Sequence, residues 1–222
     1  MEEKLTGIEK LSLNPEKIKS RIGYHIVKRI LDVVLSLVGL IVLSPLLVII
    51  MICIKWEEPH DPIFYVQTRV GQGGQYFKMY KFRSMVVDAE KKLPQLLAQN
   101  EIDGAMFKIK DDPRVTNVGR FIRKYSLDEL PQLWNVVKGD MSLVGPRPPL
   151  PREVASYSDY DKQRLLVMPG CTGLWQVTTR NDASFNEMVQ LDLKYIRKSS
   201  IRYDLKLIIM TIVVMIHPNH AY

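Results

Sequence analysis

Two adjacent carboxylates follow a basic cluster near the middle of the chain. Asp128 and Glu129 come shortly after Arg123, where a helix is expected to begin. Arginine binds phosphate oxygens through two donors at once, and a helix N-terminus adds free backbone N–H groups and a positive field. Carboxylates beside such a site can hold Mg²⁺ against a diphosphate, or one of them can attack phosphorus as a nucleophile. The pattern therefore indicates phosphate chemistry.

The same segment also allows a purely structural interpretation. Ser126 and Glu129 have the spacing of a capping box, in which two side chains satisfy backbone N–H groups at a helix start. Pro131 would disturb the first turn of such a helix. If the helix instead has Pro131 at its first position, Asp128 and Glu129 lie at its mouth. An apolar stripe follows in either case, formed by Leu130, Leu133, Trp134 and Val137.

The elements around this segment predict a mixed α/β fold, mostly helical with a small β-hairpin. Residues 63–68 and 75–82 have strand character and flank a glycine-rich turn at 71–74. No Lys-Ser or Lys-Thr follows that turn at P-loop spacing, so we interpret it as a hairpin turn. Residues 145–149 form a rigid, proline-rich extended stretch. Helices are expected at 86–99, 120–137 with an interruption at Pro131, 157–167 and 184–197, and a turn-rich loop at 169–176.

An almost unbroken apolar run covers residues 33–54. As a helix it is long enough to cross a bilayer core, and it has no polar face. Pro45 lies at its middle and is expected to kink the helix, because proline lacks a backbone donor and clashes with the preceding turn. The hydroxyl of Ser44 could satisfy the backbone group that the kink frees.

Charge on both sides of the run bears on its topology. Cytoplasmic flanks of membrane helices are rich in Lys and Arg, and here both flanks are basic. One interpretation consistent with this charge is that both ends are cytoplasmic and the helix bends back at Ser44-Pro45. A single span with a tolerated proline remains the alternative at this point. The flanking residues are Lys17, Lys19, Arg21, Lys28 and Arg29 before the run, and Lys55, Arg69, Lys78, Lys81 and Arg83 after it.

The last apolar segment, residues 205–216, is too short to span a membrane. Basic residues precede it, so it suits an amphipathic helix at the membrane interface; a buried core helix is the alternative. If the helix bends back, the chain divides into a cytoplasmic lead-in (1–27), a re-entrant membrane helix (28–55) and a cytoplasmic domain that carries Asp128 and Glu129 and ends in an interfacial helix (56–222).

Composition limits the partners. The 222 residues carry a formal net charge of +7, which favours an anionic partner. Nucleic acid is not expected, because the chain has no Cys/His finger spacing, aromatic-basic strand motif or basic region before heptads. Lipid headgroups and phosphates are better candidates. Cys53 and Cys171 are too few for a disulfide framework or a zinc site.

Between Lys28 and about Ile212 the chain carries, in order, the motifs Lys28-Arg29-x-x-Asp32, Ser44-Pro45, Tyr80-Lys81-Phe82-Arg83-Ser84-Met85, Asp112-Pro113-Arg114-Val115-Thr116, Ser126-Leu127-Asp128-Glu129-Leu130-Pro131-Gln132, Lys138-Gly139-Asp140-Met141-Ser142-Leu143-Val144-Gly145-Pro146-Arg147-Pro148 and Pro169-Gly170-x-Thr172-Gly173. With these motifs it resembles the bacterial sugar transferase family, the monotopic polyprenol-phosphate phosphoglycosyl transferases. One departure is Cys171, where a β-branched apolar residue is expected; a small buried thiol can substitute there.

The resemblance implies roles for particular residues. Asp128 would be the nucleophile that forms a phosphosugar-aspartyl intermediate, and Glu129 would complete the dyad by assisting proton transfer or the metal. Mg²⁺ is the expected cofactor, with Asp128 and Glu129 as its ligands. Lys81 and Arg123 would contact phosphate, and Arg147 the nucleotide diphosphate. The membrane helix would be re-entrant, bent at Ser44-Pro45.

The resemblance also implies a reaction and a place. The enzyme would move a hexose 1-phosphate from a UDP-sugar to polyprenyl (undecaprenyl) phosphate and release UMP, the first membrane step of exopolysaccharide, capsule or glycan biosynthesis. It would act at the cytoplasmic face of the bacterial inner membrane. The resemblance leaves open whether the chain forms a homo-oligomer. One alternative function is a glycosyltransferase that releases a nucleoside diphosphate, but that class normally needs a larger Rossmann-like body or many membrane spans, and this chain has neither. A second alternative is a membrane-tethered scaffold for glycan enzymes, but a scaffold would not need the residues around Asp128 and Glu129.

Overall fold

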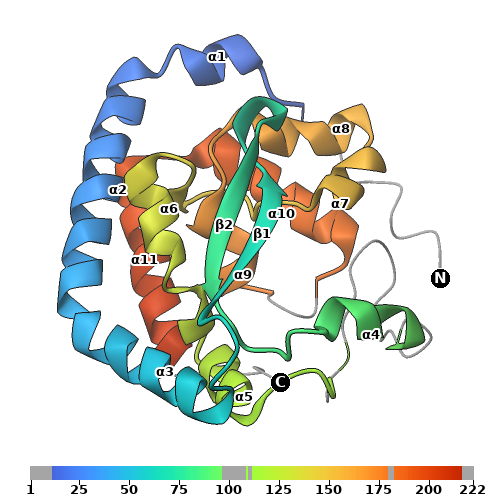
Figure 1. Ribbon diagram of the computed structural model, residues 1–222. Helices are drawn as coiled ribbons and strands as arrows, with labels where there is room; N and C mark the ends of the chain where they lie inside the picture. The colour runs from blue at the N-terminus through green and yellow to red at the C-terminus, as the bar shows by residue number, and fades with distance from the viewer. Residues whose placement is uncertain (1–11, 97–108, 110–111, 180–182, 217–222) are drawn as a thin grey trace.

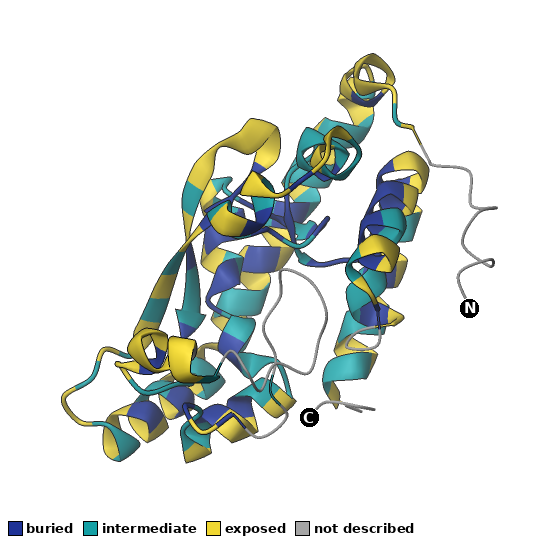
Figure 2. Cartoon of the chain, turned by 90° about the vertical axis from the view of Figure 1, so that its right-hand side faces the viewer, coloured by how far each residue is buried: buried dark blue, intermediate teal, exposed yellow. Residues whose placement is uncertain are grey.

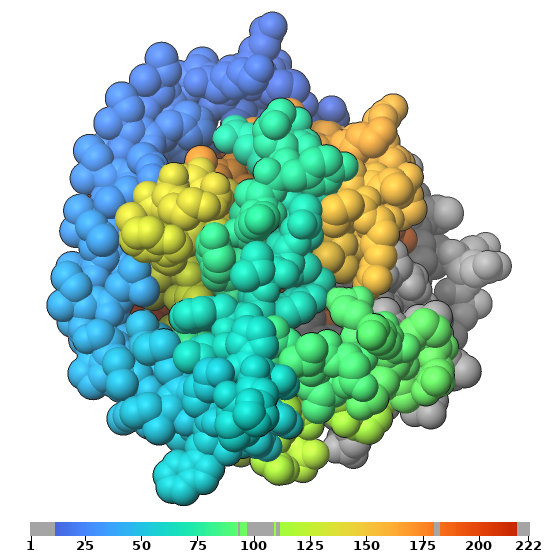
Figure 3. Space-filling model, in the orientation of Figure 1, coloured from blue at the N-terminus to red at the C-terminus, as the bar shows by residue number. Residues whose placement is uncertain are grey.

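Helices surround two small β-sheets in a computed structural model that describes residues 12–96, 109, 112–179 and 183–216. The prediction of a mostly helical chain with a small hairpin is confirmed. α2 (Ile22–Val42) and α3 (Ser44–Glu57) run along one edge of the molecule, and the hairpin crosses its front (Figure 1). In the space-filling view the hairpin covers the middle of this face, between α6 (Gln132–Lys138) and α8 (Asp159–Lys162) (Figure 3).

The hairpin joins β1 (Phe64–Val70) to β2 (Tyr76–Phe82) in antiparallel register. Phe64 lies opposite Phe82, and Val70 opposite Tyr76. The connecting turn, η1 (Gln72–Gly74), holds Gly73 and Gly74 at φ of 65° and 83°. Glycine adopts this left-handed conformation without the steric cost that a side chain brings. The predicted strands and the hairpin turn are therefore confirmed, with small shifts at their ends.

A bend of 61° separates α2 from α3 at the predicted position. Pro45 has no N–H to donate to the carbonyl of Ile41, and the hydroxyl of Ser44 donates to that carbonyl at 2.7 Å instead. The predicted position of the bend is therefore confirmed. Within the described part of the chain no single helix has the length and apolar character of a membrane span. The bent pair α2–α3 meets that criterion when taken together, by length and composition only.

A second sheet was not predicted. β3 (Ser142–Val144) pairs in parallel with β4 (Gly170–Thr172). The prediction of a turn-rich loop at 169–176 is therefore wrong, because this stretch contains β4 and most of α9 (Leu174–Val177). Strands of three residues are too short for an alternating pattern to stand out. The pairing depends on close backbone contact, since a Cβ on Gly170 would lie only 2.0 Å from the nitrogen of Gly145.

The remaining helices agree with the predicted order and differ at their ends. The expected helix at 86–99 begins later, at Ala89, and positions 97–99 lie outside the described residues. The helix expected at 184–197 is confirmed, with Ser184 and Glu187 forming its capping box. The bounds are α1 (Pro15–Lys19), α4 (Ala89–Leu96), α5 (Asn117–Lys124), η3 (Leu127–Glu129), α7 (Pro151–Ala155), η4 (Gln163–Leu166), α10 (Phe185–Lys198) and α11 (Ile201–Ile216).

Three apolar clusters lie among the described residues, and Figure 2 colours buried residues dark blue; the smallest cluster joins Met79 of β2 to Val136 of α6. Val144 of β3, Leu193 of α10 and Leu207 of α11 belong to the largest cluster. Ile54 of α3 and Ile122 of α5 belong to the second. Each such side chain contributes roughly 1.5–3 kcal/mol when fully buried. The second cluster fixes α3 to the body that carries the carboxylates.

α11 packs along one side only. Asp204 and Leu207 are its buried residues, so the alternative of a fully buried core helix is wrong. Its outer apolar side chains remain exposed in the folded chain, as do many on α2 and α3. The exposed set includes Ile26, Ile30, Val38 and Ile41 on α2, Val48, Ile49 and Ile52 on α3, and Leu205, Ile209, Ile212, Val213 and Ile216 on α11.

Candidate active site

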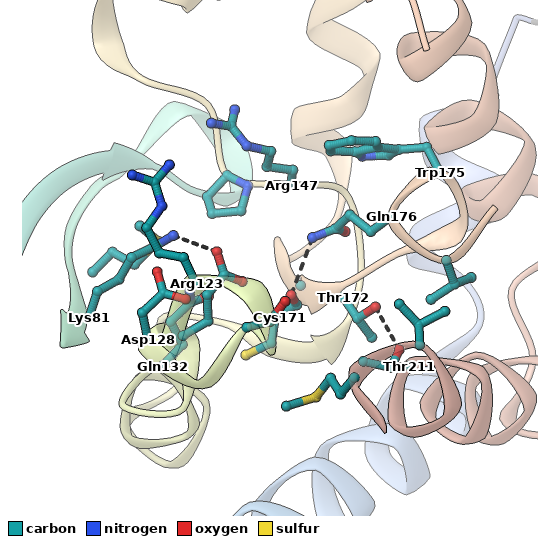
Figure 4. A pocket seen from close by; sticks show the side chains of 18 of the residues that line it. Lys81, Arg123, Asp128, Gln132, Arg147, Cys171, Thr172, Trp175, Gln176 and Thr211 are labelled. Atoms are coloured by element: carbon teal, nitrogen blue, oxygen red, sulfur yellow. Dashed lines mark hydrogen bonds and ion pairs between the residues drawn. The ribbon is translucent and has the colours of Figure 1, made fainter. Parts of the chain in front are cut away.

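A cavity of ≈ 390 Å³ brings together all five polar residues predicted from the sequence (Figure 4). They come from different elements: β2, α5, η3 and the loop after β3. Carboxylates and cations therefore converge from distant parts of the chain. The five residues are Lys81, Arg123, Asp128, Glu129 and Arg147.

The carboxylates lie on the short turn η3, before the regular helix α6. Ser126 has φ of 55° and is the only described residue other than glycine in the left-handed region. Its side chain caps no helix among the described residues, so the capping-box interpretation of Glu129 is wrong. α6 begins at Gln132 directly after Pro131, as the alternative predicted to within a residue. Proline suits a helix start because its missing N–H would have no partner there.

The two carboxylates have different environments. Lys81 Nζ lies 2.5 Å from Oε1 of Glu129. Burial raises the pKa of Asp128 to about 6, and the nearby charge of Lys81 offsets this only in part. Burial also acts to raise the pKa of Glu129, but the charge and hydrogen bond of Lys81 outweigh it and the pKa is lowered. Asp128 is thus an unusually basic carboxylate that is ionised near neutral pH, as a nucleophile must be.

Asn135 joins α6, the helix that follows the two carboxylates, to β2, the strand that carries Lys81. Its side chain is fully buried in α6 (0% exposed). Oδ1 accepts a hydrogen bond from the backbone nitrogen of Tyr80 at 3.0 Å, and Nδ2 donates to the carbonyl of Lys78 at 2.7 Å. The amide therefore pairs with β2 much as a neighbouring strand would. Because an unpaired buried group costs about 1–3 kcal/mol, this contact fixes the position of Lys81 against η3.

The loop that presents Arg147 is held from behind. Arg164 donates to the carbonyl of Arg147 at 3.4 Å and is itself paired with Asp192 in the buried interior. Glu153 accepts from the backbone nitrogen of Leu150 at 2.8 Å and lies 3.5 Å from the Arg147 guanidinium. The backbone of the loop is fixed, while the guanidinium of Arg147 lines the cavity (Figure 4).

Arg69 is a further cation at the cavity, which the sequence analysis counted only as flanking charge. It is 6% exposed. It donates to the carbonyl of Pro148 at 3.0 Å and to Gln67 at 2.6 Å. Burial and the charge of Arg147 lower its pKa to about 10, so it stays protonated at neutral pH. The strand spacing offered no signal for this role, because it depends on the loop that packs over β1.

The opposite side of the cavity carries no charge. Cys171 on β4 is among its residues, and burial raises the pKa of this thiol, with the charge of Glu129 adding to the effect. The thiol is therefore protonated and is a poor nucleophile, consistent with the small apolar role predicted for it. Sequence reasoning missed the other members. The set comprises Cys171, Thr172, Trp175, Gln176, Thr211, Val214 and Met215.

The Lys28-Arg29-x-x-Asp32 motif joins α2 to three elements at or beside the cavity: α6, β3 and α11. Arg29 donates to the carbonyls of Val136 and Val137, at the end of α6, at 2.6 and 2.9 Å. Asp32 accepts from the backbone nitrogen of Leu143 in β3 at 3.1 Å. Lys28 lies 3.1 Å from Asp204 of α11. The long N-terminal helix is thereby fixed to the elements that carry the site.

The family follows from a comparison with known proteins. Residues 23–218 match the model of the family described as bacterial sugar transferase. The chain belongs to this family. The matched range of this sugar transferase includes nearly all of the bent helix pair and every residue that lines the cavity.

Curated relatives of this sugar transferase have informative names. Over 87% of the chain it is 47% identical to a galactosyl transferase, CpsE, of Streptococcus agalactiae, and over 88% it is 45% identical to an undecaprenyl-phosphate galactose phosphotransferase of Salmonella typhimurium. These matches cover 43% and 41% of the relatives, so the chain spans less than half their length. The exopolysaccharide production protein ExoY of Sinorhizobium fredii is 41% identical, and the match covers 83% of both chains.

Proposed function

We propose that this protein transfers a hexose 1-phosphate from a UDP-sugar to undecaprenyl phosphate and releases UMP. The observation that carries the proposal is the position of Asp128, which has a raised pKa and lies beside the Lys81–Glu129 ion pair. Arg69, Arg123 and Arg147 line the same cavity. The names of the relatives support undecaprenyl phosphate as acceptor and a hexose phosphate as the transferred group.

In the first step a carboxylate oxygen of Asp128 attacks the phosphorus that bears the sugar. A new phosphorus–oxygen bond forms to Asp128, and the bond to the bridging diphosphate oxygen breaks. UMP leaves with that electron pair, and the sugar phosphate stays on Asp128. Cations fixed around the phosphates stabilise the charge that builds up on the equatorial and leaving oxygens. In this proposal Lys81, Arg123 and Arg147 have this role, and Arg69 supports the Arg147 loop through the carbonyl of Pro148.

In the second step a phosphate oxygen of the lipid attacks the same phosphorus. The bond to Asp128 breaks, the carboxylate is restored, and the product is a polyprenyl diphosphate sugar. Dividing the transfer in this way lets one cavity serve both anionic substrates in turn. The lowered pKa of Glu129 suits it to holding a cation better than to accepting a proton.

Mg²⁺ fits the donors present. Among the described residues no group of three or more His, Cys, Asp or Glu side chains could hold a metal ion. Mg²⁺ commonly uses only one or two carboxylates together with substrate phosphates and water. Asp128 and Glu129 would hold it with the donor diphosphate. When bound, the ion would neutralise charge on the diphosphate oxygens.

The exposed apolar faces of α2, α3 and α11 support binding of the protein to the inner membrane, which we propose occurs at its cytoplasmic face. In this proposal α2 and α3 form a re-entrant hairpin around Ser44-Pro45, α11 lies at the interface, and both ends are cytoplasmic. A single cysteine replacing Lys19, in a background lacking Cys53 and Cys171, tests this. Labelling of that cysteine from outside intact cells would contradict the re-entrant arrangement.

Product analysis tests the reaction itself. The purified protein, incubated with a panel of UDP-sugars, undecaprenyl phosphate and Mg²⁺, should release UMP and form a lipid diphosphate sugar. Release of UDP would instead indicate a glycosyltransferase that moves the sugar without its phosphate. No turnover with any UDP-sugar, under conditions where a known relative turns over, would favour a scaffold.

A further inference from the structure

We propose that Trp175 and Gln176 of α9 form the subsite that binds the hexose of the donor and discriminates between hexoses. This inference rests on the proposed function, because it assigns the uncharged side of the same cavity. Figure 4 shows both side chains across the cavity from Lys81 and Asp128. The charged side matches the diphosphate, which leaves the uncharged side for a neutral part of the donor.

Two polar atoms on this side lack partners within the described structure. The indole nitrogen of Trp175 and Oε1 of Gln176 are both buried and make no hydrogen bond. Nε2 of Gln176 donates to the carbonyl of Cys171 at 3.3 Å, which orients the amide and leaves its oxygen as the open acceptor. A buried donor or acceptor without a partner destabilises the folded protein. A ligand that binds in the cavity and hydrogen-bonds to both atoms, after a small rotation of either side chain, removes this destabilisation.

A sugar hydroxyl matches this pair. It can accept a hydrogen bond from the indole N–H and donate one to the amide oxygen at the same time. The indole face also offers an apolar surface to the C–H groups of a hexose ring. A polyprenyl chain has no polar group for either atom, so the lipid is better suited to Val214 and Met215, which line the same cavity.

The reaction sequence favours the hexose over the uracil base. The nucleoside leaves with UMP after the first step, whereas the hexose remains attached to phosphorus on Asp128 until the second. Contacts that serve both steps belong on a rigid element. α9 meets this requirement, because Leu174 and Val177 are buried on either side of the pair. A Cβ on Gly173 would lie 2.5 Å from the carbonyl of Gly145, so α9 is also fixed against the Arg147 loop.

Trp175→Phe tests the proposal through donor selectivity, because it keeps an aromatic face and removes the N–H. A site built around a sugar hydroxyl discriminates strongly when one of its polar contacts is lost. The ratio of kcat/KM for UMP release between UDP-galactose and UDP-glucose should therefore change by about tenfold or more. Inhibition by UMP should stay unchanged. Trp134→Phe on α6, at a side chain 50% exposed outside the cavity, is the matched control and should leave the ratio unchanged.

A binding measurement separates the subsite from the chemistry. In saturation-transfer NMR of Asp128→Asn protein with UDP-galactose, magnetisation should reach the hexose protons, and adding Trp175→Ala should abolish this while the uracil signals persist. That result would support the subsite even if the wild type released no UMP, in which case only the proposed reaction would fail. An unchanged selectivity ratio in Trp175→Phe, or loss of uracil and hexose signals together, would overturn the assignment.

Discussion

Lys81 Nζ lies 2.5 Å from Oε1 of Glu129, and this ion pair joins strand β2 to the turn that carries both carboxylates. Lys81→Met removes the cation that stabilises both ionised carboxylates and the transferring phosphate. We expect UMP release to fall by about 100-fold or more, as when one preorganised donor is lost from a site that stabilises developing charge. Lys81→Arg, which keeps the charge, should be impaired less. Near-wild-type turnover of the Met variant would remove Lys81 from the phosphate site.

The raised pKa of Asp128 predicts the acid limb of the activity profile. The nucleophile must be ionised, so kcat/KM for UMP release should fall below a pH of about 6, by about tenfold per pH unit. Steady-state rates between pH 4.5 and 8 measure this. A profile that stays flat down to pH 5 would contradict the assignment.

The same pKa has a consequence for stability. Because the folded-state pKa of Asp128 lies above its ordinary value of 3.8, the folded protein binds the proton more tightly, and folding is penalised as pH rises through this window. Asp128→Asn removes the penalty. The melting temperature of the variant should exceed that of the wild type at pH 7 and converge with it near pH 4, in scans at both pH values. An equal difference at the two pH values would indicate another origin.

Arg29 is predicted to act through α6. Its guanidinium serves two carbonyls at the end of that helix, and a lysine at this position has no planar fork to do the same. Arg29→Lys and Arg29→Ala should therefore both lower the melting temperature by a few degrees and reduce kcat more than they raise KM. Arg197→Ala, at an exposed site on α10, is the control and should change neither. Full rescue by lysine would mean that charge alone matters.

The close backbone contact of Gly145, directly after β3, with the segment that leads into β4 predicts different effects of two alanine substitutions. A Cβ at Gly145 would lie 2.5 Å from the carbonyl of Met168, so Gly145→Ala must displace the Arg147 loop. We expect loss of UMP release and a lower melting temperature. Gly23→Ala in α2 has nothing within 4 Å and should be neutral or stabilising, by up to about 1 kcal/mol. If both variants behave alike, the close approach does not position the loop.

Local signals account for what the sequence predicted. Ser44-Pro45 specifies the bend because a missing N–H and a neighbouring hydroxyl act within one turn. The glycine turn specifies the hairpin because positive φ is a property of single residues. Asp128 and Glu129 stood out through their neighbours in the chain.

Long-range contacts account for what the sequence did not predict. β3 and β4 pair through residues far apart in the chain, with Gly145 directly after β3 in close contact with Gly170. Arg69 reaches the site because the Arg147 loop packs over β1. Trp175 and Gln176 read as part of a loop because the four-residue helix α9 is too short to show periodicity. The capping-box interpretation failed because Ser126 adopts the left-handed conformation, which the spacing of Ser126 and Glu129 does not reveal.

Covalent trapping at Asp128 tests the central claim most directly. Wild-type protein is incubated with Mg²⁺ and a UDP-sugar labelled in the hexose, without lipid acceptor, then quenched, digested and analysed by mass spectrometry. The two-step account predicts one hexose phosphate on the peptide that contains Asp128, matching release of UMP, and none in Asp128→Asn. Turnover to lipid product without any label on Asp128, or substantial turnover by Asp128→Asn, would contradict it and require direct transfer between the substrates.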